Sequence, residues 1–345
     1  MLSAITNRKF CVLNLLALLT ACGGGSGGSP EAAPPPVPPP PPPPVLTSPA
    51  AATTLSVSLS GLALKVSGAS RSVSVVNTGA HPATLVEVDP AVVFPAGTTY
   101  LNHCATLAPG ATCTITITPG AVASAPPGAL APVPVSMAVR GSNTNTPTVQ
   151  VHVLDYGSVY QGGHVFALDD ATPPSASIGG KVAIAGDSTA LYNWSQHNVA
   201  PGAVFEIPGV TDNSAGPLPF CNGKFDGACN TQRIVSAPEH VGVPLTGYAA
   251  GACRSTLNGY ADWYLPAICE LSDSPSAGCT SGETVQEKLH TPGHASFPTS
   301  WSSTQWSVGP VALAWFHSFV PAGGSSAGTF KGVPTAASCV RQLTP

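Results

Sequence analysis

The sequence predicts a mainly β chain, and three observations support this fold class. Apolar and polar residues alternate with a period of two over much of residues 53–154, which is the pattern of half-buried strands. Only 8% of the residues are charged, and the chain contains 36 Gly and 38 Pro, a composition that suits short strands joined by turns better than long amphipathic helices. Eight cysteines follow residue 22, an even number that is typical of disulfide-bonded exported domains.

The first domain, residues 53–154, is expected to be an antiparallel β-sandwich. Its alternating positions are Leu55, Val57, Leu59, Val73, Val75, Cys113, Ile115, Ile117, Val133, Val135, Met137, Val139, Val149, Val151 and Val153. Turn residues such as Asn77-Thr78-Gly79 and Pro119-Gly120 separate these runs. His81 and His103 occupy turn-like contexts and are expected to face solvent. Because nothing here suggests chemistry, we interpret the domain as a stalk.

Two stretches of this domain point to a family. Residues 72–88 (SVSVVNTGAHPATLVEV) and residues 104–120 (CATLAPGATCTITITPG) resemble the immunoglobulin-like repeats of the ASPM/SPD-2/Hydin type, which occur in bacterial surface proteins. The resemblance implies that the sandwich is immunoglobulin-like.

Residues 1–22 are expected to be a lipoprotein signal peptide. The pair Arg8-Lys9 is a short basic region, and Phe10–Leu19 is an apolar run too short to span a bilayer as a stable helix. The run ends in Leu19-Thr20-Ala21-Cys22, which resembles the lipobox of bacterial lipoproteins. That resemblance implies cleavage before Cys22 and lipidation of its thiol.

A tether is expected to separate this lipid from the folded domains. Residues 23–29 are nearly all Gly and Ser, and residues 34–44 are proline except for Val37, so the first part is flexible and the second a stiff polyproline II segment about 34 Å long. We assign residues 23–52 to this tether. Gly23 after the lipobox cysteine resembles an outer-membrane address. We therefore expect an exported outer-membrane lipoprotein that is attached to the membrane through its lipid. Display at the cell surface is one of two alternatives, because the face of the membrane stays open.

The second domain, residues 155–345, contains several uncommon sequence motifs. They are YQGGHVF at residues 160–166, NGYADWYLPAICEL at residues 258–271, WSST at residues 301–304 and Cys339-Val340-Arg341. In this order they resemble the Lcl C-terminal-domain family, long described as a domain of unknown function. Similar tryptophan-leucine-proline turns occur in C-type-lectin-like folds and in the sulfatase-activating family. By this analogy the domain is a compact α+β fold with disulfides.

The resemblance also suggests a binding function, and the charge of the domain bears on which class of ligand it could bind. Domains of this family lie at the ends of bacterial surface proteins, including a collagen-like adhesin whose terminal domain binds polyanionic glycans. Residues 156–345 carry seven basic and twelve acidic side chains, a net charge of −5. Because a sulfated glycan needs a positive surface field, this charge disfavours a polyanionic ligand. A neutral sugar, a protein or an envelope polymer stays open as the ligand, homo-oligomerisation is left open, and no nucleic-acid partner is expected.

Aromatic and polar residues within and beside these motifs are the candidate ligand surface. Trp263, Trp301 and Trp315 are large apolar residues and are expected to anchor the core. The WSST block already supplies Trp301, so a second tryptophan close to it is expected to face outward, and His317 is expected to alternate outward and be half exposed. The candidate ligand-binding residues are Tyr260, Tyr264, Gln305, Trp306 and His317.

The eight cysteines allow up to four disulfides. The close pairs Cys104/Cys113, Cys221/Cys229 and Cys269/Cys279 are natural candidates, which leaves Cys253 with Cys339. Because connectivity does not follow from sequence alone, other pairings stay open.

The chain lacks the sequence signatures of common active sites. It contains no GxSxG, HExxH, phosphate-binding loop or dinucleotide motif, so no catalytic residue and no cofactor are expected. His290 and His294 are separated by Pro292-Gly293 and do not share a helix face, and Asp169-Asp170 has no further acidic residues at ligand spacing. We expect both to be surface loops and not metal sites. Glu270 is expected to be a structural hydrogen-bond partner.

Three functional hypotheses follow. The first is a surface-displayed binding or adhesion lipoprotein with a glycan or protein ligand, in which the second domain does the recognising. The second is a structural lipoprotein of the cell envelope without a specific ligand. The third and weakest is an oxidoreductase-like enzyme related to the sulfatase-activating fold, which requires free reactive thiols.

Overall fold

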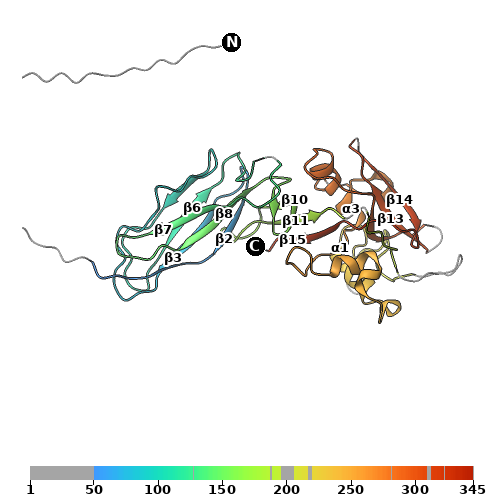
Figure 1. The fold of residues 1–345 in the computed structure, drawn as a ribbon, viewed down its shortest axis with the longest axis horizontal. Helices are drawn as coiled ribbons and strands as arrows, with labels where there is room; N and C mark the ends of the chain where they lie inside the picture. Colours follow the sequence, from blue (N-terminus) through green and yellow to red (C-terminus); the bar gives the residue numbers. More distant parts are fainter. Residues whose placement is uncertain are drawn as a thin grey trace, which may run out of the picture. The chain divides into compact units, whose positions relative to one another are not determined.

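The computed structural model describes residues 50–126, 128–186, 189–195, 206–216, 220–280, 282–308, 312–321 and 323–344 (Figure 1). Residues 50–345 form one compact unit. The expected signal peptide, the lipid site Cys22 and the tether up to residue 49 lie outside the described residues. Within the ranges given above, no helix combines the length and the apolar character that a membrane span requires.

The first part of this unit is a sandwich of two four-stranded sheets. One sheet has the order β1 (Leu55–Val57), β3 (Arg71–Asn77), β6 (Thr112–Thr118) and β5 (Thr99–Asn102). The other has the order β2 (Gly61–Lys65), β8 (Thr148–Leu154), β7 (Val135–Arg140) and β4 (Glu87–Val88). All pairs are antiparallel except β2 and β8, which run parallel. The predicted mainly β fold with an immunoglobulin-like sandwich is confirmed.

The alternation in the sequence builds the core of this sandwich. In β3 every second residue is buried, and Val73 and Val75 meet Ile115 and Cys113 of β6 in register. Val133 is an exception, because it precedes β7 and is 41% exposed. The prolines on both sides of it, Pro132 and Pro134, lack the N–H that a sheet ladder needs, so the strand starts after them.

The second part of the unit combines two sheets with short helices, as the predicted α+β class requires. One sheet has the order β15 (Cys339–Gln342), β11 (Gly179–Ile184), β10 (Gly163–Asp169) and β9 (Val159–Tyr160). The other has the order β12 (Ser300–Gln305), β13 (Leu313–Ser318) and β14 (Ser325–Phe330). The helical segments are α1 (Gly227–Val235), η1 (Pro238–His240), η2 (Leu245–Gly247), α2 (Ala249–Arg254), α3 (Ile268–Leu271), η3 (Pro275–Ala277) and the π-helix η4 (Gln286–His290).

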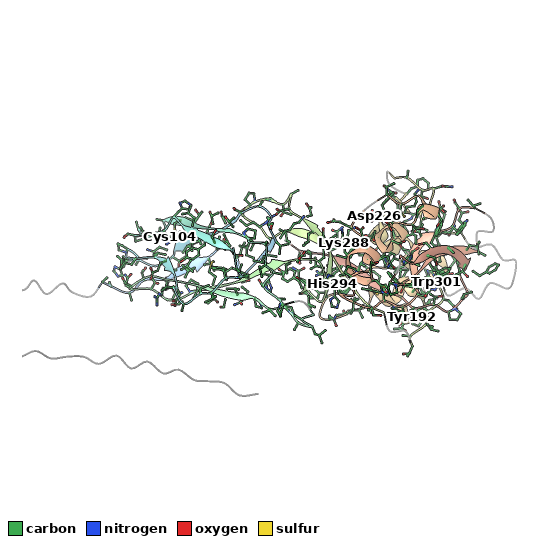
Figure 2. All side chains as sticks on the ribbon, turned by 90° about the horizontal axis from the view of Figure 1, so that it is seen from above. Cys104, Tyr192, Asp226, Lys288, His294 and Trp301 are labelled. Carbon is green, nitrogen blue, oxygen red and sulfur yellow. A yellow bond between two sulfur atoms is a disulfide. The ribbon has the colours of Figure 1, made fainter. Side chains whose placement is uncertain are left out.

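Buried tryptophans organise the core of this second part. Trp263 and Trp301 are fully buried and Trp315 is 2% exposed, so all three are core residues as predicted. Trp194, which the sequence analysis did not single out, is fully buried as well. The indole N–H of Trp301 donates to the backbone carbonyl of Tyr192 at 2.8 Å, and the two residues lie together in Figure 2.

A buried arginine joins the two parts. Arg71 of β3 is 1% exposed, and its guanidinium forms an ion pair with Asp170 at 2.7 Å. It also donates to the backbone carbonyls of Pro173 and Ala176 at 3.0 and 2.8 Å. The expected solvated loop at Asp169-Asp170 is therefore wrong for Asp170, which the arginine holds half-buried.

Candidate functional site

Four disulfides stabilise the described chain. They link Cys104 with Cys113, Cys221 with Cys229, Cys253 with Cys339 and Cys269 with Cys279. These are the four pairs that the sequence suggested. All eight cysteines after residue 22 are thus bonded in disulfides.

The distant sequence motifs of the second part meet around Arg341. Its guanidinium, 2% exposed as a side chain, pairs with Asp262 through two hydrogen bonds of 2.8 Å each. A further guanidinium N–H donates to the side-chain oxygen of Gln161 at 2.9 Å, and the group lies 4.0 Å from the centroid of the Tyr260 ring. The motifs near residues 160, 260 and 340 therefore form one structural network, in which Tyr260 is half-buried by stacking on the arginine.

Three of the five candidate ligand-binding residues are buried. His317 is 1% exposed, Gln305 is 0% exposed and Tyr264 is 4% exposed, so the expected exposed surface is wrong at these positions. His317 shares its face of β13 with Trp315, two residues before it, because side chains alternate along a strand. The side chains of Gln286 and Ser326 then enclose its ring, at 3.0 Å from Nε2 and 2.9 Å from Nδ1.

Tyr264 and Gln305 are buried because their polar atoms have partners inside the protein. The Tyr264 hydroxyl donates to Glu270 at 2.9 Å, and its backbone N–H donates to the Val340 carbonyl at 2.8 Å. Burial, followed by the charge of Glu270, raises the pKa of Tyr264 well above its ordinary value, which keeps the hydroxyl protonated as a donor. The Gln305 side chain accepts a hydrogen bond from Lys331 at 2.8 Å.

Trp306 is half-buried instead of facing outward. Its ring stacks on Trp315 with centroids 4.3 Å apart and an interplanar angle of 17°. Gly328 allows this arrangement, because a Cβ atom at that position would collide with the Trp306 ring. The stacked pair packs on the cluster that contains Cys269 and Cys279, and the stacking covers one face of the Trp306 ring.

A pocket of about 600 Å³ lies where β10, β11 and β15 meet α3. This volume falls in the range of small-molecule sites in proteins. Its side chains are mostly polar, and three of them are carboxylates. The lining residues that carry side-chain chemistry are Asp169, Lys181, Phe225, Glu270, Glu283 and Gln342.

Glu270 lines this pocket with a buried carboxylate that is held by hydrogen bonds. The carboxylate is 5% exposed, and one oxygen accepts from Lys181 and Tyr264 at 2.6 and 2.9 Å. The other oxygen accepts from the backbone N–H groups of Ala267 and Gly227 at 2.8 and 3.2 Å. The predicted structural role of Glu270 is confirmed, and its charge is balanced by Lys181.

Replacing this carboxylate by an amide, Glu270→Gln, is expected to lower the free energy of unfolding by about 1–2 kcal/mol. The amide keeps the volume of the side chain but removes the charged acceptor of four hydrogen bonds. The loss is moderate because the Lys181 side chain is 29% exposed, so water can solvate its amine after the ion pair is lost. Urea unfolding checks the value. Gln232→Glu on the exposed side of α1 is a control that changes charge without touching this network. An unfolding free energy equal to that of the wild type would contradict the structural role.

The other side of the pocket is more open to solvent. The Phe225 ring is 39% exposed directly before α1 begins. Glu283 is exposed, and one of its oxygens accepts from the Tyr156 hydroxyl at 2.6 Å, which orients the carboxylate. Sequence reasoning missed Phe225 and Glu283 because they come from separate segments and neither belongs to a motif.

A second cavity of about 860 Å³ lies between residues 121–129, residues 155–158 and the segment near Lys288 and His294. Small apolar residues and backbone dominate its sandwich side. Its few charged groups are partly satisfied, since Lys288 pairs with Glu287 at 3.1 Å. We therefore regard the 600 Å³ pocket, with its fixed carboxylate and exposed ring, as the better candidate.

Among the residues that the structure describes, no group of three His, Cys, Asp or Glu side chains is arranged to hold a metal ion.

Comparisons with known proteins give no family for the chain. No family and no curated protein matches it. Among solved structures it is similar to a fimbrial protein from Bacteroides ovatus ATCC 8483, with 10% identity, a TM-score of 0.30, and coverage of 84% of this chain and 70% of that chain. It is also similar to a protein of unknown function from Porphyromonas gingivalis W83, with 13% identity, a TM-score of 0.23, and coverage of 31% and 49%.

A third similar structure is the surface layer protein SbsC, domains 4–9, with 16% identity, a TM-score of 0.23, and coverage of 41% of this chain and 21% of that chain. The chain spans half or less of the length of the surface layer and P. gingivalis proteins. At these scores the similarities assign no function, and the site has to be interpreted from its own chemistry.

Proposed function

We propose that the protein is a surface-displayed lipoprotein whose C-terminal part binds a neutral glycan in the 600 Å³ pocket. The observation that carries the proposal is the exposed Phe225 ring beside hydrogen-bonding groups held on strands. Carbohydrate rings present C–H faces that pack on aromatic rings and hydroxyls that hydrogen-bond to carboxylates and amides. Glu283 and Gln342 supply such polar groups at the same pocket.

The charges of the pocket favour a neutral ligand over a polyanion. Asp169 and Glu283 add negative charge, while Lys181, the only cation among the described residues of the lining, is already paired with Glu270. A sulfated or phosphorylated glycan would meet repulsion from these carboxylates. A neutral sugar has no such penalty.

Surface display is supported by the sequence and by the disulfides. The lipobox-like segment ending at Cys22, followed by the Gly/Ser/Pro-rich tether, suits a lipid-anchored domain held away from a membrane. Disulfides persist in oxidising compartments, and four of them are present in the described chain.

The test is binding of the full chain to an array of neutral oligosaccharides, with heparin as the polyanionic arm. Phe225→Ala is expected to weaken binding about two- to tenfold, since losing an aromatic contact costs roughly 0.5–1.5 kcal/mol and each 1.4 kcal/mol is a factor of ten. Phe330→Ala is the matched control, because this ring on β14 is 60% exposed and does not line the pocket.

Three outcomes would contradict the proposal. Neutral-sugar binding that is equally sensitive to both variants would place the ligand elsewhere. Heparin binding without neutral-sugar binding would show that the pocket charge does not decide the ligand. An array without any bound sugar, from a folded sample, would favour the structural lipoprotein.

A further inference from the structure

The side chains of Lys331 and Gln305 meet in the protein interior, at one end of the three-stranded sheet. Gln305 is the last residue of β12, and Lys331 directly follows β14. Their exposures are 0% and 3%, so water hardly reaches either side chain. The amine Nζ of Lys331 donates to the amide oxygen Oε1 of Gln305 at 2.8 Å and lies 4.6 Å from the centroid of the Trp194 ring.

The Gln305 amide is arranged as an electrophile. Its oxygen accepts a second hydrogen bond from the backbone N–H of Ile207 at 3.1 Å. When the Lys331 amine turns to the carbonyl carbon, the Ile207 N–H remains as the donor that stabilises negative charge developing on the oxygen. The amide nitrogen Nε2 is buried and has no hydrogen-bond partner among the described residues, so no described group has to release it when it leaves.

The Lys331 amine is arranged as a nucleophile. Burial lowers the pKa of Lys331 to about 7, while the nearby Glu206 charge acts in the opposite direction. About half of the amine is then unprotonated at pH 7, compared with well under 1% for an ordinary lysine. A buried lysine with this property can attack a carbonyl group.

From this geometry we propose that Lys331 and Gln305 form an intramolecular isopeptide bond. The unprotonated Nζ attacks the side-chain carbonyl carbon Cδ of Gln305, and the oxygen of the tetrahedral intermediate is held by the Ile207 N–H. The bond from Cδ to Nε2 then breaks. A proton passes from the attacking nitrogen to the leaving nitrogen, so that one secondary amide forms and one ammonia is released. No oxidant, reductant or further reactant is needed.

Three physical features favour this reaction over hydrolysis of the amide. Fixed positioning of two reacting groups can correspond to effective concentrations of about 10⁵–10⁸ M. Exclusion of water from the two side chains removes the competing nucleophile. Release of ammonia to solvent makes the step effectively irreversible.

The bond would covalently link the two edge strands of one sheet. In the order β12-β13-β14, strand β13 lies between the two linked strands. The cross-link therefore closes a covalent ring that contains β13 and β14, and it keeps the end of β12 joined to the end of β14 when the sheet opens. Such a ring suits a domain that is tethered at one end and loaded by a ligand, but its formation does not depend on glycan binding.

Tryptic mapping of the full wild-type chain tests the proposal. No Lys or Arg lies between Lys288 and Lys331, and the next basic residue is Arg341. A Lys331 that is not cross-linked gives two peptides, residues 289–331 and 332–341, after the disulfides are reduced. Acylation of Lys331 blocks that cleavage, so we expect one peptide, residues 289–341, lighter than its sequence mass by one ammonia. Fragmentation should join Gln305 to Lys331.

Lys331→Arg is the matched control, because it keeps the tryptic site and removes the nucleophile. It is expected to give peptide 289–331 without mass loss, and Gln305→Leu is expected to restore cleavage at Lys331. If either variant does not fold, the wild-type map alone decides. Complete cleavage of the folded wild-type chain at Lys331, with both peptides at their sequence masses, would overturn the proposal.

Discussion

Replacing Cys253 and Cys339 together by alanine is expected to lower the free energy of unfolding by about 4.5 kcal/mol, the largest effect of any change considered for this chain. This disulfide joins α2 to β15 over a sequence separation of 86 residues. A cross-link that closes a long loop removes much conformational freedom from the unfolded chain, and this stabilises the folded state. Both cysteines are buried, at 0% and 5% exposure, so their removal also leaves a small cavity.

The matched control is the double replacement of Cys221 and Cys229, whose separation is only eight residues. The same relation predicts a loss of about 2.5 kcal/mol for this short loop. Urea unfolding of both variants under non-reducing conditions measures the difference. Equal losses would show that loop length does not determine the contribution of the long-range disulfide.

Lowering the pH from 7 to 4 is expected to remove about 3 kcal/mol of stability through His317 alone. Burial, together with a smaller contribution from the nearby His290, lowers the pKa of His317 to about 4, against an ordinary value of 6.5. Asp273 acts weakly in the opposite direction. Because the folded state holds the ring neutral, its stabilising contribution is complete above pH 6.5. It is lost as the pH falls toward 4, where the unfolded chain binds the proton more tightly.

Other groups titrate in the same range, so the measurement needs a variant without this ring. In His317→Asn the amide retains hydrogen-bonding capacity toward Gln286 and Ser326 but does not take up a proton. Urea unfolding at several pH values is expected to give a shallower decline for the variant than for the wild type. Parallel pH profiles would mean that the folded protein does not hold His317 neutral.

Local patterns in the sequence were sufficient to predict the strands of the sandwich. Alternation in β3 and β6 decides which side chains face the core, since a sheet with one buried face imposes a period of two. The same reasoning found the buried tryptophans Trp263, Trp301 and Trp315, because rings of this size have few alternatives to the core in a chain with 6% aromatics.

The same rule fails for β12. All six residues of β12 are buried, although five of them are Ser, Thr or Gln, because both faces of this strand are covered. A strand with two covered faces carries no period of two, and its polar groups are satisfied by hydrogen bonds that only the fold supplies. This is why Gln305 was expected at the surface and lies in the interior. His317 follows Trp315 by two residues, so the period of two itself places its side chain on the buried face of β13.

The sequence alone thus determined the mainly β class, the alternating sandwich strands and the short-range disulfide candidates, because each depends on neighbours within a few residues. Only the tertiary structure decided the pocket around Phe225 and Glu270 and the pairing of Lys331 with Gln305. These sites join segments far apart in the chain, and no local pattern records which distant polar group meets which. Whether a side chain is exposed at such places depends on what packs over it, and that is a property of the folded chain.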